Sequence, residues 1–382
     1  MSWQVPIYSN RPEEGTLQYL QDESTLKTAE GFFSFSYYNH DKIRGQSWKD
    51  KGTSIYIWGL YLYTKVLEIE PFQKWKLLIY TDQYTYEKLQ ALTSDDLDYE
   101  RIQALLTNPK IVFVIVNWER HMRKEKKVNG GALRCFRSRA PFDFPDKLVL
   151  IRDADTFFDD IVSRLQFPAR FGPRYLSYIK MVAQMLQDWE TGYVQVIQHV
   201  EKEMGKPLLV VGTGSNVTLS LMGANVKVPL YKKNYHDNEI SGIKLPFGVF
   251  AGMVGVLPGV PIYQTMDAWN ECVDYINYRS TKGERVTEND NTFYRFSNNK
   301  TPQAMGRDEQ MYLYILMKKS ISNLFFFHID LGDLETPTIE KIDLPFHEAR
   351  LAEYKAAIGL AGGGRRQKTY RKKRSNRITR KH

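Results

Sequence analysis

The 382-residue chain is 42% hydrophobic and 13% aromatic, which is ample for a sizeable core in one elaborated domain or roughly two units. Its two cysteines, Cys135 and Cys272, lie far apart without metal-ligand spacing, which excludes a disulfide framework and structural zinc and indicates a reducing compartment. The net charge of +9 is misleading, because residues 365–382 hold ten Lys or Arg and no acid, and the remainder has 43 basic (53 minus 10) and 44 acidic residues.

No targeting or membrane-spanning segment is expected. Residues 1–15 lack the apolar stretch of a signal peptide. The longest apolar run, residues 55–67, is shorter than the ~20 residues that a membrane helix needs. We therefore expect a protein of the cytoplasm.

Four apolar runs that alternate with helical patterns organise the first 160 residues. Such alternation indicates βαβ units, and runs without polar alternation are typical of strands buried on both faces of a parallel sheet. The expected fold class is α/β, with a mostly parallel central sheet and helices on both faces. Strands are predicted at residues 31–39, 75–82, 110–118 and 147–151, and helices over 53–70 and within 85–106.

The second half of the chain has a less regular pattern. Two short strands are expected within 208–231, and Gly212 and Gly214 between them indicate a turn, since the third glycine of a dinucleotide-binding motif is missing. An apolar, glycine-rich segment follows at 247–261. Helices are predicted at residues 174–205, 263–276 and 306–320, and a last strand at 323–333.

Polar or aromatic residues stand at the ends of all four predicted strands of the first half. Ligands of open α/β sheets gather at the carboxyl ends of the strands. An aromatic residue at such an end can stack on a nucleobase or simply pack in the core. The residues at these ends are Tyr37, Asp82, Trp118 and the pair Asp153 and Asp155.

The pair of aspartates suggests a cation site. In the stretch DKLVLIRDADTFFDD, residues 146–160, a buried strand runs directly into Asp153-Ala154-Asp155. Side chains two residues apart in an extended segment point the same way, so both carboxylates can face one point. Two anions held so close repel unless a cation neutralises them, and hard oxygen ligands favour Mg²⁺ or Mn²⁺. Such an ion commonly takes up the phosphates of a substrate.

The passage ALRCFRSRAPFDFPDKLVLIRDADTFF resembles nucleotide-sugar glycosyltransferases of the GT-A fold, closest in style to glycosyltransferase family 8, the glycogenin and bacterial galactosyltransferase type. The resemblance covers about residues 130–160, is topological over 30–118 and is thin beyond 160. It implies a GT-A domain with an N-terminal extension (1–30), a nucleotide-sugar-binding half (31–160), an acceptor-binding half (161–360) and a disordered basic tail (361–382). It also implies a UDP- or GDP-sugar donor and a glycan or protein acceptor.

The resemblance assigns roles to several residues. The motif Asp153-Ala154-Asp155 would bind Mn²⁺ or Mg²⁺ and the donor diphosphate, and Arg134 or Arg137 would contact the donor. Arg152 departs from the family pattern, in which a hydrophobic or small residue is usual, and could reach a phosphate or a neighbouring acid. The segment 247–261 resembles the small-residue strand that lines the sugar pocket, or is a tight packing point.

Two downstream segments match the family in part. The helix beginning GRDEQ places Asp308, Glu309 and Gln310 where the family has a D-Q-D motif that faces the sugar or acceptor, although a plain acidic helix start is an equal alternative. His328 ends the last strand where the family places a third metal ligand, with one extra residue before the following glycine. His236 is the alternative ligand.

Other functions are compatible with parts of the sequence. A haloacid dehalogenase phosphatase box would need Thr156 one position later. A nucleotidyltransferase of related fold would show a better Gly- and Lys-containing loop than residues 40–52 provide. A non-catalytic structural protein of a virus could keep the fold and act through its tail.

The basic tail follows the linker Gly362-Gly363-Gly364. A flexible polycation binds nucleic acid or an acidic membrane surface through its charge, or only aids solubility. Its composition resembles C-termini of proteins from large DNA viruses of protists or algae, which would place the protein in the host cytoplasm or the virion.

Overall fold

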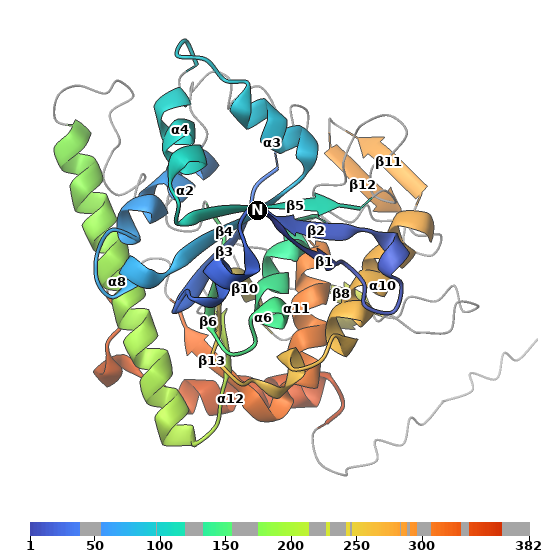
Figure 1. Ribbon diagram of the computed structural model, residues 1–382. Coiled ribbons are helices and arrows are strands. Elements are labelled where there is room, and N and C mark those ends of the chain that lie inside the picture. Colours follow the sequence, from blue (N-terminus) through green and yellow to red (C-terminus); the bar gives the residue numbers. More distant parts are fainter. Residues whose placement is uncertain are drawn as a thin grey trace, which may run out of the picture.

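The computed structural model describes residues 1–38, 55–96, 98–118, 133–154, 175–213, 227–229, 242–244, 247–282, 284–288, 291–295, 307–329 and 336–360. Within these ranges a nine-stranded sheet crosses the molecule, and helices cover both of its faces (Figure 1). None of the described helices is both long and apolar enough to span a membrane. The chain is thus an α/β protein, as predicted.

The strands of the sheet come from the whole length of the chain. The predicted strands match β4, β5 and β6 to within one residue at each end, whereas the predictions for β3 and β13 run three and five residues too far, and the glycine-rich segment 247–261 contains β10. In spatial order the strands are β1 (Trp3–Pro6), β2 (Thr16–Tyr19), β5 (Ile111–Asn117), β4 (Lys76–Thr81), β3 (Gly31–Ser36), β6 (Leu148–Arg152), β10 (Val249–Val256), β7 (Leu209–Thr213) and β13 (Leu324–His328).

The prediction of a mostly parallel sheet is wrong, because the sheet is mixed. Strands β5, β4, β3 and β6 are parallel to one another, and β7 is parallel to β13. However, β1 and β2 form an antiparallel hairpin on β5, and β10 runs antiparallel to both β6 and β7. A buried apolar run has the same appearance in either direction, so the orientation of β10 could not be read from its residues.

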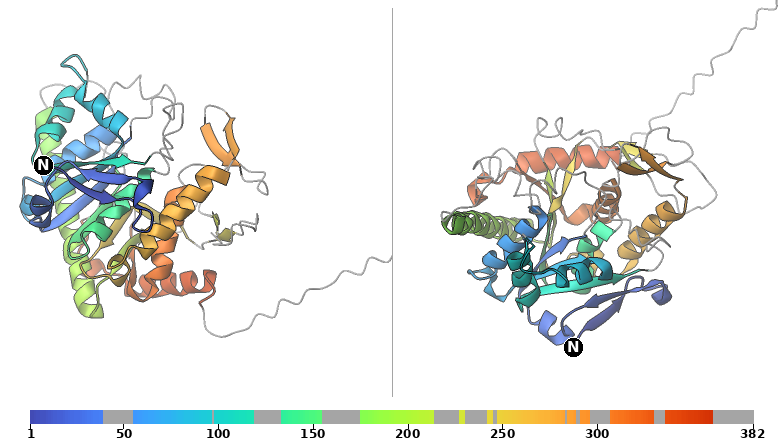
Figure 2. Two further views of the ribbon diagram at one scale, coloured as in Figure 1. Left: turned by 45° about the vertical axis from the view of Figure 1, so that its right-hand side comes forward. Right: turned by 90° about the horizontal axis from the view of Figure 1, so that it is seen from above.

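Two groups of helices enclose the sheet. Helices α2 (Ile55–Val66), α4 (Tyr99–Thr107) and α8 (Tyr175–Met204) pack together on one face. The opposite face carries the 3₁₀ helix η5 (Cys135–Arg139) and helices α6 (Ala140–Asp143), α10 (Asp267–Lys282) and α11 (Arg307–Lys319). We call these the α8 face and the α11 face; Figure 2 shows α8 and α10 on opposite sides of the sheet. The structure also has helices α1 (Glu23–Lys27), α3 (Gln83–Gln90) and α12 (Leu344–Ala357), the 3₁₀ helices η6 (Pro261–Tyr263) and η7 (Ile321–Asn323), and the strand pairs β8 (Lys227–Pro229) with β9 (Gly242–Lys244) and β11 (Glu284–Glu288) with β12 (Asn291–Arg295).

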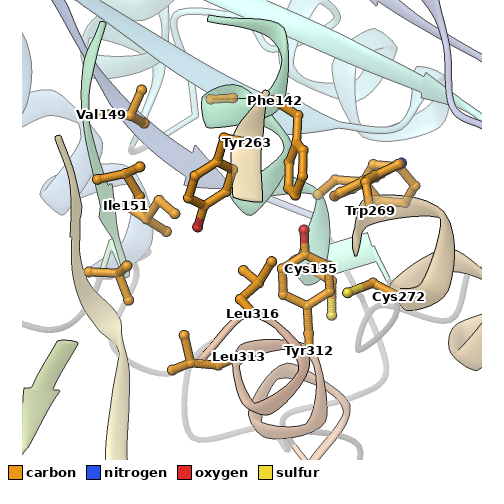
Figure 3. Packing of buried hydrophobic residues seen from close by; sticks show 14 of the residues in the cluster. Cys135, Phe142, Val149, Ile151, Tyr263, Trp269, Cys272, Tyr312, Leu313 and Leu316 are labelled. Carbon is orange, nitrogen blue, oxygen red and sulfur yellow. The ribbon is translucent and has the colours of Figure 1, made fainter. Parts of the chain in front are cut away.

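Aromatic side chains dominate the core of the α11 face. Phe142 of α6 meets Tyr263 of η6 and Trp269 of α10 in edge-on contacts, and Trp269 also meets Tyr312 of α11 (Figure 3). The main-chain oxygen of Ile7 accepts hydrogen bonds from the Trp269 indole and from the Arg139 guanidinium. The N-terminal hairpin is therefore fastened to α10 and η5.

Helix α12 covers the outer edge of β13 and satisfies one of its backbone groups. The buried His347, 4% exposed, accepts a hydrogen bond at Nδ1 from the Phe326 N–H over 3.1 Å. Burial, with Lys206 and Lys355 nearby, lowers the pKa of His347 from 6.5 to about 4. Only the neutral imidazole has an acceptor to offer to this edge N–H.

We expect acid to weaken the docking of α12. A histidine whose pKa is 6.5 when unfolded and about 4 when folded binds more protons in the unfolded state. Its contribution is therefore fully present above pH 6.5 and is lost as the pH falls toward 4. Urea unfolding across this range should show a stability decrease that is smaller in His347→Gln. An equal decrease in both proteins would contradict this assignment.

Candidate functional site

The connections between the parallel strands create a point at which the strand order reverses. The chain passes from β3 to β4 and β5 on one side and then returns to β6 on the other side of β3. The carboxyl ends of β3 and β6 therefore meet where the strand order reverses, and ligands of open α/β sheets bind at such a point. Tyr37 and Asp153 directly follow these two strands.

Side chains alternate between the two faces along each strand, so the residues of this edge can be assigned to a face. Val149 and Ile151 of β6 lie in the core of the α11 face, whereas Leu150 lies in that of the α8 face. Asp153 thus belongs with the α11 face. The same alternation places further polar residues on this face at the carboxyl edge: Ser34, Ser36, Tyr38, Thr213 and His328.

Side chains at the end of β3 hold the backbone of residues 133–137 next to the carboxyl edge of the sheet. Ser34 donates a hydrogen bond to the Arg137 carbonyl oxygen and Ser36 to that of Arg134. Tyr38 donates to the Leu133 carbonyl oxygen. Hydrogen bonds from Ser34 and Ser36 of β3 and from Tyr38 beyond its end therefore fix the backbone that carries both candidate arginines.

Arg137 is the arginine that reaches Asp153. Its Nη1 lies 3.0 Å from Asp153 Oδ1, and the two side chains are 3% and 36% exposed. Hydrogen bonds between ionised partners are stronger than neutral ones, so the buried guanidinium sets the direction of a carboxylate that still faces solvent. Arg134 is half-buried and lies near Tyr38, where its charge partly offsets a pKa that burial and then Asp82 raise well above the usual value.

The other predicted strand-end residues take part in local structure. Asp82 is buried and caps α3, its Oδ1 accepting from the Thr85 N–H over 2.8 Å. Tyr37 packs against the core of the α8 face, and Trp118 is almost fully buried beside Phe136. Asp82 remains within electrostatic range of the Tyr38 hydroxyl, and its charge contributes to the raised pKa of that hydroxyl.

The backbone after β6 is enclosed from the α8 face. A Cβ atom added to Gly59 of α2 would lie 1.8 Å from the carbonyl oxygen of the buried Ala154. Only glycine allows this approach. An isolated glycine inside the apolar helix pattern of residues 55–67 was a sequence signal for a close contact, but it did not identify the partner. Asp155 lies outside the described residues.

His328 lies at the same edge but three strands away. It is paired in register with Thr213, and β10 and β7 separate it from β6, a distance of about 14 Å at the usual strand spacing. Its ring packs edge-on against Phe346 of α12. The buried His328 Nδ1 and Thr213 Oγ1 find no hydrogen-bond partner among the described residues.

Helix α11 directs its first turn toward this edge. Only residues 320–323 separate its end from the start of β13, so the helix ends at the amino edge of the sheet and begins on the carboxyl side. In agreement, the Tyr312 hydroxyl reaches the Ser138 carbonyl oxygen of η5. The side chains of Asp308, Glu309 and Gln310 lie outside the description, as do Gly214 and His236.

Strand β10 is irregular next to the carboxyl end of β6. Phe250 and Val254 pair with the adjacent β7 residues Gly212 and Val211, so residues 251–253 bulge out of the ladder. Met253 of this bulge pairs with Arg152 of β6, directly before Asp153. Bulges occur often beside active sites, because they redirect side chains.

The described residues include one carboxylate, Asp153, that stands at the predicted cation site. Among them, no three His, Cys, Asp or Glu side chains come together in a group that could hold a metal ion. Mg²⁺ needs no such cage, since it is commonly held by one or two carboxylates together with substrate phosphates. The partly exposed Asp153 carboxylate and the unsatisfied His328 Nδ1 have suitable donor chemistry.

No protein-family model matches this chain, and no curated protein or solved structure is significantly similar to it.

Proposed function

We propose that the chain is a metal-dependent glycosyltransferase of the GT-A type, which moves a sugar from a UDP- or GDP-sugar to a glycan or protein acceptor. One observation carries the proposal: the Asp153 carboxylate, held at 3.0 Å by the buried Arg137, stands where the strand order reverses. A carboxylate and a guanidinium at one point suit a diphosphate with its counter-ion. The sequence DAD adds a second carboxylate, Asp155, two residues after Asp153.

The roles of the residues follow from charge and position. Asp153 and Asp155 would hold Mn²⁺ or Mg²⁺, whereas His328, about 14 Å from β6, is too far from Asp153 to bind the same ion and is not assigned to it. When bound, such an ion supplies Lewis acidity toward the departing nucleoside diphosphate. Arg137 contributes a fixed positive charge on the same side, in a site where burial strengthens electrostatic interactions.

The acceptor side is assigned to the start of α11. The helix begins on the carboxyl side of the sheet, as the short connection to β13 requires. Asp308, Glu309 and Gln310 would orient the sugar or the acceptor hydroxyl there. A carboxylate in this place also stabilises positive charge that develops at the anomeric carbon.

A thermal-shift screen of nucleotide sugars with Mn²⁺ tests the proposal. A ligand that binds only the folded protein raises its stability by an amount that grows with concentration, about 2.7 kcal/mol at 100 times the dissociation constant. We expect at least one UDP- or GDP-sugar to raise the melting temperature only when Mn²⁺ or Mg²⁺ is present. The absence of any such shift would refute the donor assignment.

The basic tail is proposed to act separately, in contacts with nucleic acid. It lies outside the described residues, and its ten Lys or Arg account for the whole net positive charge. Deletion after Gly364 should remove binding to nucleic acid that weakens steeply with added salt, because counterion release drives such binding. The truncated protein should transfer sugar as the full chain does. A parallel loss of transfer would show that the two functions are not separate.

A further inference from the structure

Arg152, the residue directly before Asp153, is anchored on the opposite face of the sheet. Both its side chain and that of Glu190 on α8 are 0% exposed. Arg152 Nε and Nη2 donate to the two carboxylate oxygens of Glu190 over 2.8 and 2.9 Å, and Nη1 donates to the Val254 carbonyl oxygen of β10. The guanidinium therefore lies on the α8 face, away from the Asp153 carboxylate. Of the two partners expected for Arg152, a phosphate or a neighbouring acid, the structure contains the acid, Glu190.

The ion pair is itself enclosed by three aromatic residues. Tyr63 of α2 donates a hydrogen bond to Glu190 Oε1 over 2.6 Å. The Arg152 guanidinium lies over the rings of Tyr193 and Trp189, at 4.6 and 5.8 Å from their centroids. Burial alone would lower the pKa of Arg152, but Glu190 outweighs it and raises that pKa overall. Hydrogen bonds and ring contacts from α2 and α8 thus fix the pair in place.

The same helices also hold the residue after Asp153. The Ala154 carbonyl oxygen occupies the space where a Cβ atom of Gly59 would stand. Asp153 therefore lies between two anchored residues, Arg152 and Ala154, and its own side chain is directed to the α11 face by Arg137. A strand can end without a buried ion pair on the residue before its end and a close helix contact on the residue after it, so this double anchoring calls for a reason.

We infer that Glu190, acting through Arg152, and Gly59, acting through the Ala154 carbonyl, are positioning residues for the aspartate motif. They fix the backbone on both sides of Asp153, so that its carboxylate meets a divalent cation in a preset direction. This inference rests on the proposed function, because it assigns a purpose to the same site. Groups that orient metal ligands typically account for 10- to 100-fold in metal affinity.

The test replaces the whole ion pair with apolar residues. The double variant Arg152→Met/Glu190→Leu removes both charges together, which often leaves stability unchanged or higher. We expect it to melt near the wild-type temperature but to bind Mn²⁺, in the presence of UDP, 10- to 100-fold more weakly in an electron paramagnetic resonance titration. The KM for Mn²⁺ should rise as the affinity falls. Gly59→Ala should also weaken the binding of Mn²⁺, because the added methyl group displaces Ala154.

Tyr19→Phe is the matched control. It removes a buried hydroxyl that bonds Asp143 and Tyr80 in another part of the core, so it tests loss of stability alone and should leave Mn²⁺ affinity unchanged. A folded double variant with wild-type Mn²⁺ affinity would overturn the positioning role. If the wild-type protein itself binds neither Mn²⁺ with UDP nor Mn²⁺ with GDP, the proposed function fails, and this inference fails with it.

Discussion

Asp153→Asn is expected to lower metal-dependent sugar transfer by roughly 100-fold or more, the loss typical when one preorganised electrostatic group is removed from an active site. The substitution keeps the shape of the side chain but removes the charge that faces Arg137 and the proposed cation. Asp155→Ala should abolish transfer as well and leave the fold intact. Initial rates with a UDP- or GDP-sugar at several Mn²⁺ concentrations measure both variants.

The chain offers a matched control on the same stretch. Asp146 stands before β6, at the opposite edge of the sheet, and its side chain is 76% exposed. Asp146→Asn makes the same chemical change and should leave transfer as it is in the wild type. Unchanged turnover in Asp155→Ala, or equal losses in Asp146→Asn and Asp153→Asn, would refute the metal assignment.

The parallel half of the sheet could be predicted from sequence because each strand buries both of its faces. Runs such as LVLI leave no polar position that would suit solvent, so β4, β5 and β6 were predicted to within one residue at each end, and the start of β3 was also correct. The prediction that Asp153 stands at a carboxyl end follows directly from the end of β6. Such local patterns report burial, and burial decides where a strand begins and ends.

Partners across the sheet could not be predicted, because they depend on distant segments. Arg134 and Arg137 are equivalent in sequence, and the choice between them follows from Ser34 and Ser36, which hold the backbone from which Arg137 reaches Asp153. Asp82 has the position of a ligand, yet its carboxylate caps α3. Glu190 interrupts the buried stripe of α8, which was a signal of a partner, but nothing in the sequence identified Arg152.

Loss of Glu190 alone should destabilise the fold more than any other change considered for this chain. Glu190→Leu leaves the Arg152 guanidinium buried, at 0% exposure, without its counter-charge. Breaking a buried pair in this way costs about 3–5 kcal/mol, whereas replacing both partners with apolar residues is often neutral or stabilising. Urea unfolding should therefore give a large loss for Glu190→Leu and a recovery in Arg152→Met/Glu190→Leu.

The wild type, Arg152→Met, Glu190→Leu and the double variant form a double-mutant cycle. Together these four proteins separate the contribution of the ion pair to stability from its effect on the site. Additive effects would show that Arg152 and Glu190 do not depend on one another, contrary to their two hydrogen bonds. The double variant, if it regains stability, holds a folded β6 that ends at the same Asp153 but lacks the charged anchor before it. Any change in Mn²⁺ binding that remains in that variant then reports on how Asp153 is directed, because the stability difference has been removed.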